Sequence, residues 1–209
     1  MELNDRQPTY NELDDSTLWK TFQQGDRAAY GQMYQKYVRL LLIYGLKIWQ
    51  NEEAVRDEVQ DLFIELWKSR ERLQSTNNIK IYLFQALRYK LIRQKTKQEA
   101  ARIDLSAISN TDFLREHSHE SFLIDEENKN ENSQKLQKVM QDLPPRQQEV
   151  LHLRFYQGCS NEEIAQIMDI KYQSVSHLMY KSLEFLKKHL LEVLLWWVSD
   201  KFKYPFPEL

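Results

Sequence analysis

The clearest hydrophobic pattern in the chain runs from Leu143 to Lys188, where short stretches with apolar residues at helical spacing alternate with turn signals. Pro144 and Pro145 suit the first turn of a helix, and Gly158 marks the end of that helix. The pattern predicts three or four short helices in this part of the chain.

A capping signal and a small residue indicate how the last two of these helices are arranged. Ser160 and Glu163 have the spacing of a capping box, which begins a helix. Ala165 is small enough to let a second helix cross closely, and a short turn at 169–171 leads into that second helix, 172–188. The combination predicts a helix-turn-helix.

The amino end of the helix over 172–188 has a polar outer side. Val175, Leu178 and Met179 can pack inward at helical spacing. The side chains that point outward are Gln173, Ser174, Ser176 and His177. A helix-turn-helix presents such residues to base edges in the DNA major groove, although a three-helix bundle without a DNA role would have the same inner packing.

The first half of the chain predicts further amphipathic helices. Asp15 or Ser16 is expected to cap a short helix. A long helix is expected from Arg27 toward Trp49, and its wide apolar surface implies burial between neighbouring helices.

The next helix, expected from about Glu52 to Arg70, carries a row of acids opposite its apolar stripe. Asp57, Asp61 and Glu65 recur every four residues, and such like charges cost roughly a few tenths of a kcal/mol per pair in an isolated helix. A basic partner would offset this cost, whereas the simplest alternative is a solvated acidic face. A metal site is disfavoured because no His or Cys lies nearby and successive helical turns diverge.

A basic helix is expected from Ile79 onward. No Asp or Glu lies between Lys80 and Lys97. The basic residues are Lys80, Arg88, Lys90, Arg93, Lys95 and Lys97, with Tyr82, Phe84 and Tyr89 interleaved. Such a charge run suits phosphates, and exposed aromatic side chains beside it suit stacking on unpaired bases; the alternative is a solvated basic face.

The stretch 99–135 has the opposite charge and no apolar period. It contains nine acids and four bases, which favours an extended, flexible linker. His117 and His119 could bind a metal, but two His in a flexible segment are more often incidental. The predicted fold class is therefore all-α, with two small helical domains joined by a flexible acidic linker.

The end of the chain is unusually apolar. The run from Leu190 to Val198 could extend the last helix, and it is interrupted by Glu192 and too short to span a bilayer. Its apolar surface is expected to fold back, self-associate or meet a partner. The polar, acidic start has no secretory signal, and the net charge of -2 requires any nucleic-acid affinity to come from local patches. We therefore expect a soluble, cytoplasmic protein without membrane insertion.

Few residues suggest a catalytic centre. The single Cys excludes a disulfide within the chain and is compatible with a reducing cytoplasm. This residue, Cys159, has no evident His partner and is expected to be a small packing residue. We therefore expect no enzymatic activity, no catalytic or metal-binding residues and no cofactor.

Taken together, these segments resemble the sigma-70 family of bacterial RNA polymerase initiation factors, in particular the compact extracytoplasmic-function type that keeps only domains two and four. The resemblance rests on QDLFIELW (60–67), on IKIYLFQALRYKLIR (79–93) and on the blocks LPPRQQEVLHLRFYQG and EEIAQIMDIKYQSVSH. It implies sigma domain two at 15–97, a linker at 98–135, sigma domain four at 136–189 and an apolar extension at 190–209.

The resemblance also implies roles for particular residues. Polymerase would be bound by Asp57, Gln60, Asp61, Phe63 and Trp67. The promoter -10 element would be recognised and opened by Asn77, Asn78, Lys80, Tyr82, Arg88, Tyr89, Lys90 and Arg93. The -35 element would be read by Tyr172, Gln173, Ser174, Ser176, His177 and Lys181. The implied partners are core RNA polymerase, promoter DNA and an anti-sigma factor.

The chain departs from the family pattern in the helix-turn-helix. Asp169 stands where Gly is common, and Asp adopts a left-handed conformation less readily than Gly. His177, Leu178, Met179 and Tyr180 stand where arginines are common. Two other functions are considered, a helix-turn-helix regulator that is not a polymerase subunit and a helical protein-interaction adaptor. The absence of strand-like alternation in 15–97 disfavours the first, and the second leaves the basic helix without a role.

Overall fold

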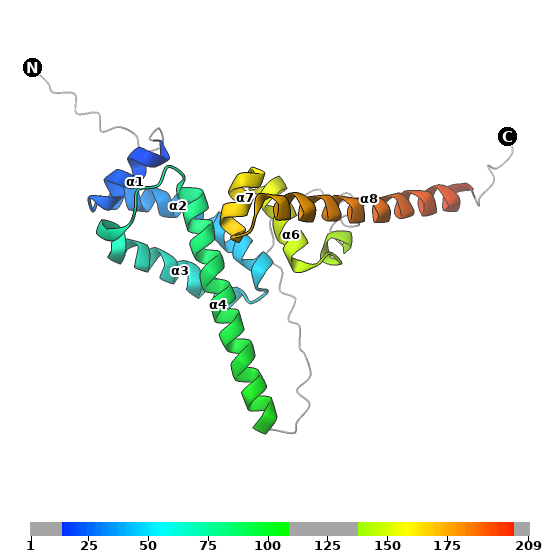
Figure 1. Cartoon of the computed structure of the whole chain (residues 1–209), viewed down its shortest axis with the longest axis horizontal. Coiled ribbons are helices and arrows are strands. Elements are labelled where there is room, and N and C mark those ends of the chain that lie inside the picture. Colours follow the sequence, from blue (N-terminus) through cyan, green and yellow to red (C-terminus); the bar gives the residue numbers. More distant parts are fainter. Residues whose placement is uncertain (1–13, 109–137, 203–209) are drawn as a thin grey trace, which may run out of the picture.

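The computed structural model of the chain describes residues 14–108 and 138–202, with side chains for 14–101 and 138–189. Within these ranges the chain is helical and has no β-strand, which confirms the all-α prediction. The elements are α1 (Asp15–Gln23), α2 (Arg27–Ile48), α3 (Glu52–Ser69), the 3-10 turn η2 (Arg70–Arg72), α4 (Ile79–Ile108), α6 (Pro145–Leu151), the π-helical turn η3 (His152–Tyr156), α7 (Asn161–Met168) and α8 (Tyr172–Phe202). We call α1 to α4 the N-terminal unit and α6 to α8 the C-terminal unit (Figure 1).

The N-terminal unit is built around large aromatic side chains. Trp19, Phe22, Tyr44, Phe63 and Phe84 are almost completely buried, and they come from all four helices of the unit. Each buried aromatic side chain removes a large apolar surface from water, so these residues dominate the core. Their packing holds α4 against α2 and α3 and thereby orients the basic residues of α4.

The start of α4 is fixed by two side chains. Asn78 Oδ1 accepts a hydrogen bond from the Ile81 N–H at 3.0 Å, and Asp15 Oδ2 accepts one from the Ile79 N–H at 3.0 Å. The first amides of a helix have no acceptor within the helix, so these two oxygens satisfy groups that would otherwise be unpaired. The bond from Asp15 also ties the start of α4 to α1.

The C-terminal unit contains the predicted helix-turn-helix. The Ser160 hydroxyl accepts from the Glu163 N–H at 3.2 Å and the Glu163 carboxylate accepts from the Ser160 N–H at 2.8 Å, which confirms the capping box. Asp169 ends α7 with φ 52° and ψ 54°, in the left-handed conformation that the turn requires. Val175 is fully buried at the start of α8, as predicted.

Several element boundaries differ from the predictions. The cap of α1 is Asp14; the expectation of Asp15 or Ser16 is wrong, because both already lie within the helix. α4 continues past Lys97 to 108. α8 continues past Lys188 to 202, as the expectation that the apolar run could extend the last helix allows. None of the described helices is both long and apolar enough to cross a membrane. His117 and His119 lie outside the described residues, as do the side chains of 190–209.

The two units are packed against each other. α7 lies against α4, and α6 lies against α2 (Figure 1). The buried apolar side chains of both units belong to one continuous cluster. The sequence predicts two domains and a linker, but it does not predict that the domains share an interface.

Candidate nucleic-acid interface

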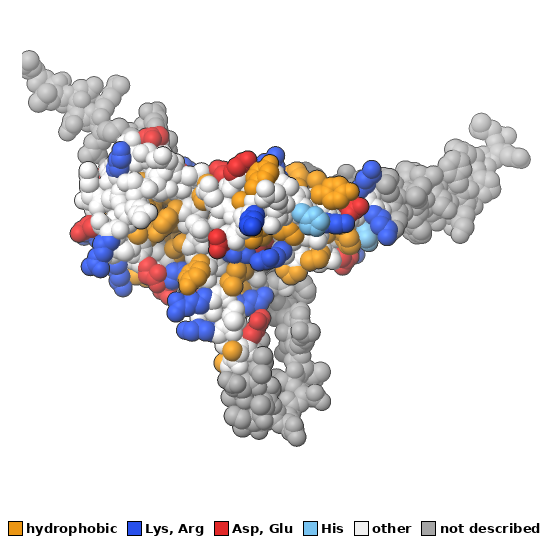
Figure 2. Space-filling view, viewed as in Figure 1, with side chains coloured by type: hydrophobic (Ala, Val, Ile, Leu, Met, Phe, Trp, Pro, Cys, Tyr) orange, Lys and Arg blue, Asp and Glu red, His pale blue; other side chains and the backbone are white. Residues whose placement is uncertain are grey.

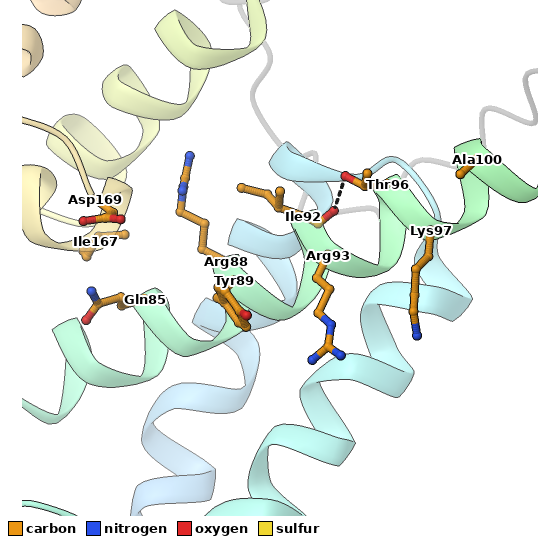
Figure 3. Close-up of a pocket in the computed structure, with 10 residues that line it drawn as sticks. All are labelled: Gln85, Arg88, Tyr89, Ile92, Arg93, Thr96, Lys97, Ala100, Ile167 and Asp169. Atoms are coloured by element: carbon orange, nitrogen blue, oxygen red, sulfur yellow. Dashed lines mark hydrogen bonds between the residues drawn. The ribbon is translucent and has the colours of Figure 1, made fainter.

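The described basic residues of α4 lie on two different sides of the helix. Figure 3 shows Arg88 pointing toward the C-terminal unit, whereas Tyr89, Arg93 and Lys97 point the other way, toward α3. Consecutive side chains are about 100° apart around a helix, so residues adjacent in the sequence, such as Arg88 and Tyr89, lie on different sides of it. We call the side of Tyr89, Lys90, Arg93 and Lys97 the open face, and the side of Asn78, Lys80 and Arg88 the covered face.

The open face borders a pocket between α3 and α4. The pocket has a volume of about 290 Å³, and its lining includes Tyr89, Lys90 and Arg93. Tyr89 is 67% exposed. Figure 2 shows Lys and Arg side chains gathered over this part of α4 and its neighbour α3. An exposed ring beside cationic groups can stack on an unpaired base while the cations hold phosphates.

Lys90 links the open face to the acids of α3. Its ammonium lies 2.7 Å from a Glu65 carboxylate oxygen and 3.8 Å from one of Glu58. Burial raises the pKa of Glu58, Lys90 opposes that rise, and Asp61, Glu65 and Asp57 add to it. One member of the acidic row, Glu65, therefore has a basic partner in its own chain, a possibility that the sequence left open.

The covered face carries donors that are occupied by the C-terminal unit. Arg88 Nε donates to Glu149 Oε1 at 2.8 Å, and Lys80 donates its ammonium to the Gln157 carbonyl. The side chains of Arg88 and Glu149 are only 12% and 8% exposed. No acid neighbours the basic run in the sequence, but the fold brings acceptors from distant segments to three of its members. These members are Lys80, Arg88 and Lys90.

The interleaved aromatic residues differ in exposure. Phe84 is fully buried, with its ring centroid 4.8 Å from that of Tyr44, so the expectation that it is exposed for stacking is wrong. Tyr82 is half-buried with its ring edge-on to Trp19, and burial raises the pKa of Tyr82. Tyr89 is the aromatic residue of this helix that is available to a base.

The residues suggested for polymerase binding lie along α3. Asp57, Gln60 and Asp61 are exposed. Phe63 is 2% exposed and belongs to the core, where it packs beneath this surface. Trp67 is half-buried near the end of the helix.

The amino end of α8 presents the polar residues suggested for base reading. Tyr172, Gln173, Ser174, His177 and Lys181 are exposed, and Ser176 is half-buried. Lys181 forms an exposed ion pair with Glu184 at 3.1 Å. The outer surface at this end of the helix is therefore exposed with respect to the described part of the chain.

Two sigma-70 family descriptions match the chain. Residues 33–101 match "Sigma-70 region 2", and residues 133–186 match "Sigma-70, region 4". Together the two matches span more than half of the chain. The chain belongs to the sigma-70 family. It is a transcription initiation factor, which acts with core RNA polymerase on promoter DNA, rather than a separate regulator or an adaptor.

Solved structures share the fold. CnrH, in complex with the cytosolic domain of CnrY, aligns with a TM-score of 0.58 at 19% identity, covering 87% of this chain and 99% of that chain. The sigma factor RpoE, in complex with the anti-sigma factor NepR from Bartonella quintana, aligns with a TM-score of 0.56 at 18% identity, covering 77% and 96%. A comparison with curated protein sequences finds no match.

Sequence reasoning missed the acceptors that occupy the covered face. Glu149 directly precedes the apolar pair Val150 and Leu151, and an acid buried beside such residues requires a partner, since a carboxylate is almost never fully buried unless it is paired. Glu163 gives no such signal, because the capping box already accounts for it. The partners themselves come from a distant part of the chain and follow from the fold alone.

Proposed function

We propose that this sigma factor opens the -10 element with the open face of α4. The observation that carries the proposal is the pocket between α3 and α4, where exposed Tyr89 stands beside Lys90 and Arg93. Extruding a base costs a few kcal/mol, which an aromatic platform and a cationic track can offset. Tyr89 stacks on the extruded base, and Lys90 and Arg93 hold the phosphates of the opened strand.

The remaining residues suggested for the -10 element have supporting roles in this proposal. They are Asn77, Asn78, Lys80, Tyr82 and Arg88. Asn77 is exposed in the loop before α4, where an unpaired base can enter. Asn78, Lys80 and Arg88 contact DNA when the covered face is free. Half-buried Tyr82 supports the pocket wall.

We infer that α3 is the docking surface for core polymerase. The exposure of Asp57, Gln60 and Asp61 supports this role. Buried Phe63 positions α3 from beneath, and half-buried Trp67 borders the surface. The chain then acts by binding, and it breaks no bond and needs no metal or cofactor.

The exposed amino end of α8 reads the -35 element in the major groove. Its proposed contacts are Tyr172, Gln173, Ser174, Ser176, His177 and Lys181. Their exposure in the second helix of a helix-turn-helix supports this assignment. The corresponding domains are 15–97 and 136–189, with 98–135 as linker and 190–209 as an apolar extension. Because CnrH and RpoE are each in a complex with a second protein, an anti-sigma factor in the case of RpoE, we infer similar control of this chain.

The test is transcription in vitro with core polymerase and a genomic template library. The double variant Lys90→Ala/Arg93→Ala is expected to retain polymerase binding but to lose promoter opening, read by permanganate reactivity of unpaired thymines, by about tenfold or more. Lys20→Ala/Arg27→Ala removes two exposed charges from α1 and α2 and serves as the matched control. Absence of promoter-specific initiation would refute the function, and normal opening by the double variant would refute the residue assignment.

A further inference from the structure

The far end of α8 combines a helical backbone with a sequence that is almost entirely apolar. α8 runs from Tyr172 to Phe202, and from 190 to 198 its sequence is LLEVLLWWV. Figure 1 shows this end of α8 extending away from α6 and α7. At 1.5 Å per residue the run spans about 13 Å, whereas the hydrocarbon core of a bilayer is roughly 30 Å thick. The run is therefore too short to cross a bilayer, but its apolar residues need a partner that covers them.

Helical geometry divides the positions of this end into two sides. At about 100° per residue, most of the apolar positions between 190 and 202 fall on one wide side of about 200°. They are Leu190, Leu191, Val193, Leu194, Leu195, Trp197, Val198 and Phe202. Leu194 lies at the centre of this side, and Glu192 and Ser199 fall on the opposite side, with Trp196 beside them. A wide apolar side with a polar back is typical of a helix that lies along a lipid surface.

Basic residues stand at both ends of the apolar run. Lys187 and Lys188 are exposed just before it, and Lys201 follows it within α8. Anionic lipid headgroups attract such residues, and a lysine stem can lie along apolar surface while its ammonium stays in water. Trp196 and Trp197 belong to the residue type that is enriched where lipid meets water. The charges and the aromatic residues thus match an anionic lipid surface.

A second copy of the chain matches this end of α8 less well. One side of a helix about 10 Å wide and about 13 Å long offers roughly 200–300 Å² per copy, whereas a specific dimer buries about 600 Å² or more on each partner. Two paired helices need only a narrow apolar stripe, and the side around Leu194 is much wider. Both parallel and antiparallel pairing would also place the lysines at the ends of one run beside those of the other, where like charges repel.

We propose that the end of α8 from 187 to 202 is an interfacial anchor, which attaches the free sigma factor to the surface of a bilayer that contains anionic lipid. The helix lies along this surface, with the side of Leu194 toward the acyl chains and the side of Glu192 toward water. The lysines at both ends of the run contact the headgroups. The attachment goes beyond the proposed function, because the residues proposed to contact DNA lie on α4 and at the other end of α8.

Flotation of the full chain with unilamellar vesicles measures the attachment. The unmodified chain is expected to float with vesicles of equal parts phosphatidylglycerol and phosphatidylcholine, and to bind vesicles of phosphatidylcholine alone about tenfold more weakly. Lys187→Ala/Lys188→Ala is expected to lose about tenfold in affinity for the anionic vesicles and little for the neutral ones. If the unmodified chain did not float with the anionic vesicles, the proposal would be overturned.

Leu194→Glu and Ser199→Glu form a matched pair of variants. Each adds one negative charge, so repulsion by anionic lipid is common to both, but only Leu194→Glu places the charge on the apolar side. Leu194→Glu is expected to bind the anionic vesicles about tenfold more weakly than Ser199→Glu. Equal binding by the two variants would overturn the interfacial arrangement.

Two measurements without lipid distinguish the anchor from other roles of the run. Sedimentation equilibrium is expected to give the same mass for the unmodified chain and Leu194→Glu, whereas a dimer that this substitution dissociates would assign the run to a second copy and overturn the proposal. Promoter-specific transcription with core polymerase is expected to be unchanged in Leu194→Glu. A loss of transcription by a variant with unchanged urea unfolding would assign the run to polymerase, which would also overturn the proposal.

Discussion

Acid should destabilise the folded chain through His152, which lies at the contact between the units. Its ring is 2% exposed and stacks on Tyr156, with centroids 5.3 Å apart, and on Tyr44 of the N-terminal unit at 6.2 Å. Its Nδ1 atom has no hydrogen-bond partner among the described residues. Burial, and then the positive charge of Lys47, lower the pKa of His152 from 6.5 to about 4. The structure therefore favours the neutral ring.

The sign and size of the effect follow from proton linkage. In the unfolded chain His152 binds a proton as the pH falls through 6.5, whereas in the folded chain it does so near pH 4. Between these values the unfolded state binds more protons, so the free energy of unfolding falls as the pH falls. One proton corresponds to at most about 1.4 kcal/mol per pH unit, or roughly 3 kcal/mol across the window. The stabilisation is complete above pH 6.5.

Urea unfolding followed by far-UV circular dichroism measures this slope. His152→Gln removes the titrating ring, so between about pH 6.5 and about pH 4 its unfolding free energy should depend less on pH than that of the unmodified chain, by up to about 1.4 kcal/mol per unit. His177→Gln is the control, because His177 is exposed on α8. Other acid-sensitive groups contribute equally to all three proteins and cancel in the comparison. Equal slopes in the unmodified chain and His152→Gln would refute the reasoning.

Three further predictions concern stability and are measured by urea unfolding. In α2, a Cβ at Gly45 would meet Val55 Cγ1 at 2.5 Å, whereas nothing lies within 4 Å of a Cβ at Gly31. Gly45→Ala should therefore lower the free energy of unfolding by about 1–3 kcal/mol, and Gly31→Ala should raise it by about 1 kcal/mol. Equal effects of the two substitutions would contradict the close packing at Gly45. Ser160→Ala should cost about 1 kcal/mol by removing the cap of α7, and a neutral result would mean that the capping box contributes nothing. Asp169→Gly should raise the free energy of unfolding by up to about 1 kcal/mol, because glycine adopts φ 52° without strain, whereas Asp169→Ala should give no gain. A gain from the alanine variant would show that the turn is not strained.

The local elements were predictable because their signals are local. The Ser160 and Glu163 capping box, the turn at Asp169 and the buried Val175 depend on residues within a few positions of one another, and all three predictions are confirmed. The helical spacing of apolar residues also identifies the buried apolar side of α3. Periodicity does not fix the end of α4, which continues past Lys97 through a segment whose apolar pattern fades but whose residues still tolerate a helix. α8 instead continues past Lys188 through the apolar run at 190–198.

The candidate site was predictable only in part. The sequence identifies the basic run, but it treats Phe84 and Tyr89 alike, although helix rotation buries the first and exposes the second. It also leaves the partners of Arg88 and Lys80 unspecified, because Glu149 and Gln157 are more than fifty residues away along the chain. Which charges are paired depends on how the two units pack, and a one-dimensional pattern contains no information on that contact.

The position of the paired charges determines how salt acts on them. Arg88 and Glu149 are almost buried, so dissolved ions screen their attraction weakly. Contacts between exposed cations and phosphates are weakened steeply by salt, because binding releases counterions from the DNA. Raising the salt concentration should therefore weaken the proposed DNA contacts of the open face of α4 while it hardly affects the ion pair between the two units.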